Sequence, residues 1–273
     1  MLTTHHLQLP HRSVAFRFDD QGGRDHIANT LSRDGLAAYE RPSPSLFALL
    51  ASSATAAILD VGANTGLYSL LAAAANPHVP IFAFEPLADA AAGLGRNLAA
   101  NADLASRIRV ESVALSRARG EAAFFETVND QGLISTSSSL EAGFAATTHA
   151  LVEQRTVLLD TLDQWSADVG LGAISLLKID VEGHERAVFE GAGRLLRVQR
   201  PIIFVELLGG ADFDFFERLL AEVGYQDVCP NARLARWLRT PTFMADGWNH
   251  VFCPLERVWI LAQACCALGL GLA

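Results

Sequence analysis

Short apolar runs alternate with longer helical stretches from residue 57 onward, and this alternation restricts the fold more than any other feature of the sequence. Short apolar runs between helices are typical of strands buried on both faces, as in a parallel sheet covered by helices. The expected strands are residues 57–61, 80–84, 108–113, 174–179, 202–206, 226–229 and 250–253. The sequence therefore predicts an α/β fold with a seven-stranded, mostly parallel sheet and helices on both faces.

The expected helices cover residues 66–75, 89–101, 159–169, 185–196 and 213–223. Residues 120–158 interrupt the alternation with a serine-rich run at 135–139, and we interpret this region as an inserted loop or hairpin. Residues 1–50 are expected to form a helical extension that packs on the core of the domain formed by residues 51–273. The apolar segment 258–273 is shorter than the ~20 residues that span a bilayer, which favours a packed terminal element or a sticky surface segment.

The charge balance restricts the partners of the chain. It has 21 basic and 30 acidic residues and a net charge of -9, which disfavours DNA and RNA because binding them requires clustered positive charge. Its four cysteines are too few for a disulfide scaffold and lack the paired spacing of a zinc site. We expect a cytoplasmic protein without a signal peptide or membrane contact, and the sequence leaves a homo-oligomer open. Only Lys178 among the basic residues is a lysine.

A glycine turn follows the first strand. Asp60 lies at the end of that strand, and the chain then passes through Gly62, Ala63, Asn64 and Gly66 into a helix. Glycines allow a sharp turn and a close approach to a ligand, and the helix N-terminus offers free N–H groups. In an open parallel sheet, ligands bind at such a crevice beyond the carboxyl ends of the strands. These residues are the first candidates for a cofactor site.

Two classes of cofactor compete for this crevice. The pyrophosphate of a nicotinamide dinucleotide is bound by the spacing GxGxxG, but Asn64 occupies the position of the middle glycine. Asp60 could hold the ammonium group of a ligand through water or a main-chain amide, a role that a dinucleotide site does not need. We therefore favour S-adenosyl-L-methionine as the cofactor and keep a nicotinamide-dependent oxidoreductase as the alternative.

The second and third strands add further candidates. Glu85 and Pro86 end the second strand about 20–25 residues beyond the glycine turn, where a carboxylate can bind a ribose diol. Either acid alone could be structural, Asp60 as a capping carboxylate and Glu85 as a solvated strand end. Together, after two buried strands, they favour cofactor binding. The expected lining of the adenine, after the third strand, is Ser112, Val113 and Ala114.

Candidate catalytic groups follow the fourth and fifth strands. Asp180 is expected to face the same crevice, as a cofactor-binding or a catalytic residue. A neutral hydroxyl must lose its proton to accept a methyl group, and the candidate bases are His184, Asp180 and Glu182, with Glu206 from the neighbouring strand. A histidine is suited to act as a general base, but His184 could equally begin the next helix. Lys178, in a central strand, needs a partner, and Glu206 is the expected one. Lys178 could be a catalytic residue or part of a purely structural ion pair.

These motifs resemble the FkbM-type S-adenosylmethionine-dependent methyltransferases. The matching residues are 60–66, 84–87, 97–98, 101, 113–116, 161–163, 178–185 and 205–207, with weaker likeness at 35–40 and 249–254. The string Lys-Ile-Asp-Val-Glu-Gly-His-Glu at 178–185 is the most specific of them. The resemblance implies a Rossmann-like class I methyltransferase fold and a methyl transfer from S-adenosyl-L-methionine, usually to a hydroxyl of a natural product, sugar or glycan.

Three questions remain open at this level. Asp180 and Glu206 occupy positions where some metal-dependent O-methyltransferases bind magnesium, but no third ligand is evident and we predict no metal. The serine run 135–139, Asn249 and His250 could bind a polyhydroxyl acceptor or could be ordinary polar residues. A module that binds the cofactor without catalysis would need Asp60 and Glu85 but not the string at 178–185.

Overall fold

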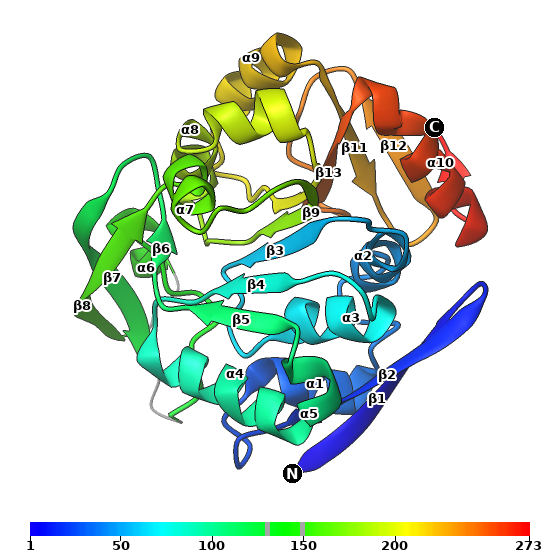
Figure 1. Ribbon diagram of the computed structural model, residues 1–273. Helices are drawn as coiled ribbons and strands as arrows, with labels where there is room; N and C mark the ends of the chain where they lie inside the picture. The colour runs from blue at the N-terminus through cyan, green and yellow to red at the C-terminus, as the bar shows by residue number, and fades with distance from the viewer. Residues whose placement is uncertain (129–131, 148–150) are drawn as a thin grey trace.

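A nine-stranded sheet forms the centre of the computed structural model, which describes residues 1–128, 132–147 and 151–273 (Figure 1). The strands lie in the order β14-β12-β11-β13-β10-β9-β3-β4-β5. Their bounds are β3 Ala57–Val61, β4 Ile81–Phe84, β5 Ile108–Glu111, β9 Ile174–Ile179, β10 Ile202–Glu206, β11 Tyr225–Pro230, β12 Leu234–Leu238, β13 Asn249–Pro254 and β14 Gly271–Leu272. The seven expected strands and the α/β fold are confirmed, and β12 with β14 extend one edge of the sheet.

Strand direction changes near that edge. β3 runs parallel to β4 and β9, and β9 runs parallel to β10. β13 runs antiparallel to both of its neighbours, β10 and β11. The carboxyl ends of β3, β4, β9 and β10 therefore lie along one side of the sheet, where the sequence analysis places the candidate site.

Helices cover both faces of the sheet (Figure 1). α2 Ser43–Ser52, α3 Leu67–Ala75, α4 Ala88–Ala100 and the short α5 Ala102–Ala105 lie on one side, and α7 Leu162–Asp168, α8 Glu185–Glu190 and α9 Phe213–Val223 lie on the other. Two separate cores result, because successive strand residues point to opposite faces. Ile58 of β3 belongs to the core beneath α2 and α3, whereas Leu59 belongs to the core beneath α7, α8 and α9.

Two of the expected helices are shorter than predicted. The helix expected at 159–169 begins at Leu162, because β8 Leu151–Asp160 continues up to the Thr161 cap, whose side chain accepts a hydrogen bond from the Gln164 amide. The helix expected at 185–196 is divided. α8 ends at Glu190, and a π-helical turn, Leu195–Gln199, follows Gly191.

The N-terminal extension is not purely helical, so that part of the expectation was wrong. β1 Leu2–Leu9 and β2 Arg12–Asp19 pair as an antiparallel hairpin, and only then do α1 His26–Asp34 and α2 follow. Buried residues alternate with exposed ones along β2, which is the period of a half-buried strand. Polar residues such as Arg17 separate the apolar ones, so this region of the sequence contains no continuous apolar run that would indicate a strand.

Side-chain amides attach the hairpin to the rest of the fold. Asn97 of α4 donates from Nδ2 to the Thr65 carbonyl oxygen at 2.8 Å and accepts from the Asp19 amide at 2.8 Å. Asn101 exchanges two hydrogen bonds with the main chain of Arg17. These bonds link β2 through α4 to the loop after β3, so the N-terminal segment lies next to the candidate site.

The region expected as an inserted loop or hairpin contains a hairpin. β7 Gly120–Val128 pairs antiparallel with β8, and β6 Ala114–Leu115 pairs with β8 on its other side. Between β7 and β8 lie the serine run and α6 Ala142–Thr147, while residues 129–131 and 148–150 of this expected insertion lie outside the described ranges.

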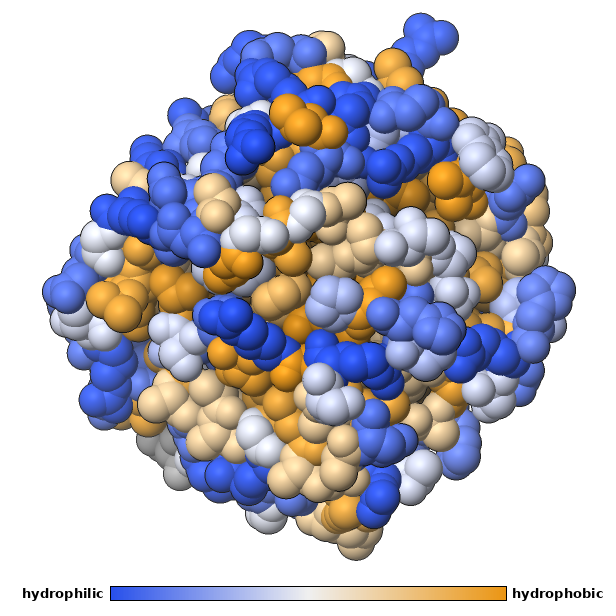
Figure 2. All heavy atoms as spheres, in the orientation of Figure 1, coloured by the Kyte–Doolittle hydropathy of each residue, from blue (hydrophilic) through white to orange (hydrophobic). Residues whose placement is uncertain are grey.

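The apolar C-terminal segment forms a packed element. α10 Val258–Ala267 lies against α2 and buries Leu261, Ala264 and Cys265, whereas Trp259 is exposed. None of the helices in the described parts of the chain has the length and apolar character needed to cross a bilayer. Apolar residues also reach the surface in the middle of the face drawn in Figure 2, among a mostly polar rim.

Candidate active site

A cavity of about 300 Å³ lies at the carboxyl ends of β3, β4, β9 and β10. Three regions of the chain enclose it: the strand ends, the insertion and the N-terminal segment. Its lining includes Asp60, Gly62, Ala63, Asn64, Glu85, Pro86, Val113, Ala114, Lys178, Asp180, Glu182, His184 and Glu206. Most of the residues that the sequence analysis selected therefore face one space.

The glycine loop approaches other parts of the chain closely. Gly62 has φ 81° and Gly66 has φ 95°, both in the left-handed region that favours glycine. A Cβ atom on Gly62 would overlap the main-chain oxygen of Asp180, and one on Gly66 would overlap the Leu94 side chain. The sequence analysis attributed these glycines to ligand approach, but the structure gives them contacts with protein. Gly66 is not among the described residues that line the cavity, whereas Gly62 is.

Glu85 is buried and holds the glycine loop in place. Its Oε2 accepts a hydrogen bond from the Asn64 amide and its Oε1 accepts one from the Leu87 amide, each at 2.9 Å. The side chain is therefore not a solvated strand end. Burial raises the pKa of Glu85 from its ordinary 4.5 to about 7, and the two amide bonds oppose that rise. Glu85 can organise the loop and still present an edge to the cavity.

Asp60 is buried at the floor of the same cavity. Its Oδ2 accepts a hydrogen bond from Ser69 Oγ of α3 at 2.6 Å. Burial raises the pKa of Asp60 from 3.8 to about 6, against the hydrogen bond from Ser69 and the positive charge of Lys178. A nearby cation would lower the pKa of this carboxyl group again, because a positive charge favours its ionised form.

The third strand contributes less than expected. Val113 and Ala114 line the cavity, as the sequence analysis predicted for the adenine side. Ser112 is exposed and is not among the described lining residues, and its contact with the adenine stays a prediction. Apolar side chains of Phe84, Leu87 and Leu115 complete this wall.

Lys178 pairs with Asp180 and not with Glu206, the partner that the sequence analysis expected. Its Nζ donates to Asp180 Oδ2 at 2.9 Å. Asp180 lies just beyond the end of β9, where the chain is free to turn its carboxylate back toward the ammonium group. Burial alone lowers the pKa of Lys178, but the negative charges of Asp180, Glu40 and Glu206 outweigh it and leave the pKa above its ordinary value.

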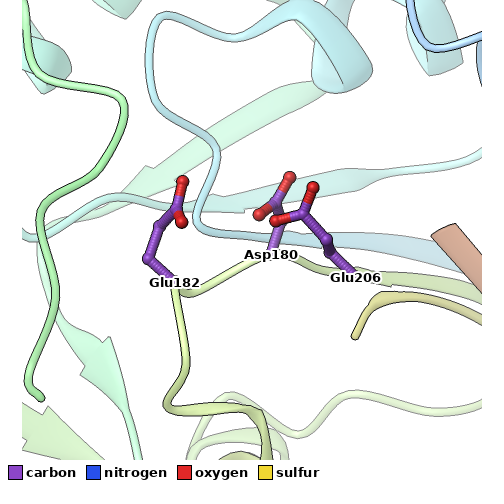
Figure 3. Close-up of side chains that lie close together, drawn as sticks. All are labelled: Asp180, Glu182 and Glu206. Atoms are coloured by element: carbon purple, nitrogen blue, oxygen red, sulfur yellow. The ribbon is translucent and has the colours of Figure 1, made fainter. Parts of the chain in front are cut away.

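Asp180, Glu182 and Glu206 bring their carboxylates together at the mouth of β9 and β10 (Figure 3). One oxygen of each lies within 4.8 Å of the others. The sequence showed no third ligand beside Asp180 and Glu206, and in the structure Glu182 takes that position. Three carboxylate oxygens of this kind could hold a hard cation. Burial, reinforced by the charge of Asp180, raises the pKa of Glu182 and of Glu206, so both side chains favour the protonated form.

His184 is held at both ring nitrogens. Its Nε2 lies 2.9 Å from Ser116 Oγ and its Nδ1 lies 2.7 Å from Glu141 Oε1 of the insertion. His184 also precedes α8 as its N-cap residue. The ring borders the cavity, but it must give up one of these contacts before it can accept a proton from a substrate.

The insertion is attached to the site at several points. Asn64 Nδ2 donates to the Ser135 carbonyl oxygen at 2.8 Å, and Ser139 Oγ donates to the Glu182 carbonyl oxygen at 2.6 Å. Ser135 to Ser138 line the cavity, including Thr136 between them. Part of the serine run therefore faces the cavity.

The sequence analysis missed the contribution of the N-terminal segment. His26, Thr30, Tyr39 and Glu40 line the cavity, and only a weak likeness at residues 35–40 hinted at a role for this region. Asn249 of β13 contacts Glu40 through Nδ2 at 3.4 Å.

His250, whose role the sequence left open, is directed away from the cavity. Its Nδ1 lies 2.9 Å from Asp227 Oδ2, and both side chains are buried between β11 and β13. His250 is therefore part of the sheet's interior and not of the cavity lining that the structure describes.

Comparison with known proteins gives a consistent result. The sequence profile of the methyltransferase FkbM domain matches residues 60–226. Methyltransferase sdnD from Sordaria araneosa is 31% identical over 155 residues, 49% of this chain and 59% of sdnD. The 2-O-methyltransferase NoeI from Sinorhizobium fredii (strain NBRC 101917 / NGR234) is 28% identical over 185 residues, 65% of this chain and 72% of NoeI. The alignment with sdnD thus spans less than two thirds of that relative.

Solved methyltransferase structures are also similar. Methyltransferase FkbM from Methylobacillus flagellatus KT matches with a TM-score of 0.46 and 16% identity, over 71% of this chain and 42% of that one. Precorrin-6y C5,15-methyltransferase from Geobacter metallireducens GS-15 matches with a TM-score of 0.41 and 16% identity, over 75% and 82% of the two chains. The profile match, and not these modest structural scores, decides between the enzyme classes, and it overturns the oxidoreductase alternative.

The contact between Gly62 and Asp180 yields a test. Replacement of Gly62 by Ala is expected to lower the free energy of unfolding by at least about 3 kcal/mol, because the new methyl group meets main-chain atoms that cannot move aside. Gly170→Ala is the matched control, since Gly170 also has positive φ, 63°, but has open space around it. That control should cost only about 1–2 kcal/mol. Equal losses for the two variants in urea denaturation would contradict the contact.

Proposed function

Because this chain belongs to the methyltransferase FkbM domain family, we propose that it transfers a methyl group from S-adenosyl-L-methionine to a hydroxyl group of a natural product, sugar or glycan. One observation carries the proposal: residues 62–64 of the glycine loop, the buried acids Asp60 and Glu85, and the acids at the carboxyl ends of β9 and β10 all line a single cavity. The lining contains both acidic and apolar side chains, which suits a nucleoside ligand with a charged tail.

The cofactor would fit the donor groups of this cavity. Asp60 and Glu85 are buried acids, and burying a charge is costly unless a partner compensates it. Glu85 would bind the ribose hydroxyls, and Asp60 and Asp180 would face the positively charged part of the ligand. Gly62, Ala63 and Asn64 would contact it through main-chain atoms, with Pro86, Val113 and Ala114 beside the adenine. S-adenosyl-L-methionine, when bound, supplies an electrophilic methyl group on a sulfonium.

Asp180 is the residue that we propose to accept the proton of the acceptor hydroxyl. It lies at the cavity and is fixed by Lys178, which occupies Oδ2 and leaves Oδ1 for the hydroxyl. Lys178 thereby orients the carboxylate, and alignment of reacting groups supplies a large part of catalysis in such transfers. His184 is the second candidate base, and its two present contacts make it the less available one.

Glu182 and Glu206 would bind the acceptor. Because their pKa values are raised, they can donate hydrogen bonds to acceptor oxygens as neutral carboxyl groups. The hydroxyl groups of the serine run lie across the same cavity. A polyhydroxyl acceptor suits this lining, and the name of the relative NoeI, a 2-O-methyltransferase, supports oxygen as the methylated atom.

Calorimetry with three ligands tests the proposed cofactor. S-adenosylmethionine and S-adenosylhomocysteine should bind and NAD should not. Glu85→Ala should weaken S-adenosylhomocysteine by roughly 10-fold to 150-fold, the range of ~1.5–3 kcal/mol for a hydrogen bond to a charged group. Glu121→Ala, at an exposed carboxylate outside the cavity, is the control and should bind like the wild type. Preferential binding of NAD, or full affinity in Glu85→Ala, would refute the assignment.

Measurements of methyl transfer distinguish Asp180 from His184 as the base. They also test the alternative that the chain binds the cofactor without catalysing a reaction. A panel of sugars and hydroxylated natural products is incubated with S-adenosylmethionine, and methylated products are detected by mass spectrometry. With an acceptor found in this way, Asp180→Asn should lower kcat by roughly 100-fold to 10,000-fold. His184→Asn should lower it by less than about 10-fold. The reverse order would make His184 the base.

A further inference from the structure

We propose that Glu40, which lies outside the family domain at residues 60–226, is a positioning residue that completes the active site by holding Tyr68 and Lys178 beside Asp180. The inference rests on the proposed function, in which Asp180 accepts the proton. It assigns a role to the N-terminal segment, which reaches the cavity although the family profile does not include it.

Glu40 connects three parts of the fold. Tyr68 of α3 donates from its hydroxyl to Glu40 Oε2 at 2.9 Å, and Asn249 of β13 lies 3.4 Å from the same oxygen through Nδ2. Glu40 has φ 43°, a left-handed conformation that costs a non-glycine residue energy and persists where surrounding contacts fix it. The carboxylate is thus fixed between a helix and a strand at the wall of the cavity.

Tyr68, which donates to Glu40, also contacts Lys178 through its ring. The Lys178 ammonium lies 5.1 Å from the centre of the Tyr68 ring, within the range of a cation–π contact, while it donates to Asp180 at 2.9 Å. Tyr68 cannot turn away from the ammonium without breaking its hydrogen bond to Glu40. The order of contacts is therefore Glu40, Tyr68, Lys178 and Asp180.

Glu40 also acts on Lys178 through charge. The acidic groups that interact electrostatically with this ammonium are Asp180, Glu40, Glu206, Asp60 and Glu182. Glu40 is the acid among these that comes from the N-terminal segment. Burial raises the pKa of Glu40, whereas the charge of Lys178 and the hydrogen bond from Tyr68 lower it, and Glu40 in turn raises the pKa of Lys178. Its loss would leave the ammonium less firmly charged and free to move, and Asp180 would lose its fixed orientation.

The composition of the chain makes this network directly observable. Lys178 is the only lysine among 273 residues, so protein labelled with ¹³C,¹⁵N-lysine gives lysine NMR signals from this one residue. Its ¹³Cε shift reports the charge of the side chain, and water exchange of its NH₃⁺ protons reports how firmly the group is held.

The test compares Glu40→Gln with the wild type. In the wild type the ¹³Cε shift should stay at its charged value up to the highest pH at which the protein remains folded, and NH₃⁺ exchange should be slow. In Glu40→Gln the onset of titration should move to lower pH and NH₃⁺ exchange should be faster. Tyr68→Phe keeps the ring and every charge but loses the hydroxyl, so it should accelerate exchange with a smaller change in titration. Glu40→Asp should restore part of the wild-type behaviour.

Controls separate this proposal from simple misfolding and from failure of the proposed function. Circular dichroism and the affinity for S-adenosylhomocysteine should match the wild type in Glu40→Gln, and Glu121→Gln should leave the Lys178 signals unchanged. With an acceptor in hand, Glu40→Gln should lower kcat by roughly 10-fold with a KM for S-adenosylmethionine within about 2-fold. Lys178 signals that are the same in Glu40→Gln and in the wild type would overturn the proposal. Absent binding of S-adenosylhomocysteine by the wild type would instead count against the proposed function.

Discussion

The close approach of the Gly62 main chain to Asp180 at the end of β9 determines how the rest of the site is assembled. Because Gly62 has no side chain, the loop after β3 can lie directly against the segment after β9. Any side chain at residue 62 would occupy the space of the Asp180 carbonyl group. Glu85 then fixes the same loop from the other side through the Asn64 amide. The proposed cofactor groups and the proposed catalytic groups are therefore joined into one unit by direct contacts.

Charge is the second constraint on this unit. Five acids line the cavity: Glu40, Asp60, Asp180, Glu182 and Glu206. Lys178 lies in the same lining and brings a positive charge among them. Acids this close together and largely shielded from water are costly as anions, which raises the pKa of Glu182 and of Glu206, while Asp180 accepts a hydrogen bond from the Lys178 ammonium. A positively charged ligand would offset part of that cost. The proposed sulfonium cofactor would bring such a charge next to these acids.

Much of this arrangement could be predicted from the sequence, because buried strands are recognisable as short apolar runs and because the ends of parallel strands share one edge. For that reason the positions of Asp60, Glu85 and Asp180 at one edge of the sheet could be predicted, whereas their roles stay predictions. The β1–β2 hairpin was missed because its apolar residues alternate with polar ones and give no continuous run. Lys178 was paired with Glu206 because neighbouring strands were known but the turn after Ile179 was not. Glu40 is far from Lys178 in the chain, and only the three-dimensional path of the N-terminal segment brings it to Tyr68.

The crystal structure of the protein with S-adenosylhomocysteine is the most direct test of the central claim, that the loops after β3 and β4 bind the cofactor beside Asp180. We expect the ribose hydroxyls at the Glu85 carboxylate, the purine beside Val113 and Ala114, and the sulfur facing Asp180. An empty cavity at saturating ligand, or a ribose bound away from Glu85, would contradict it.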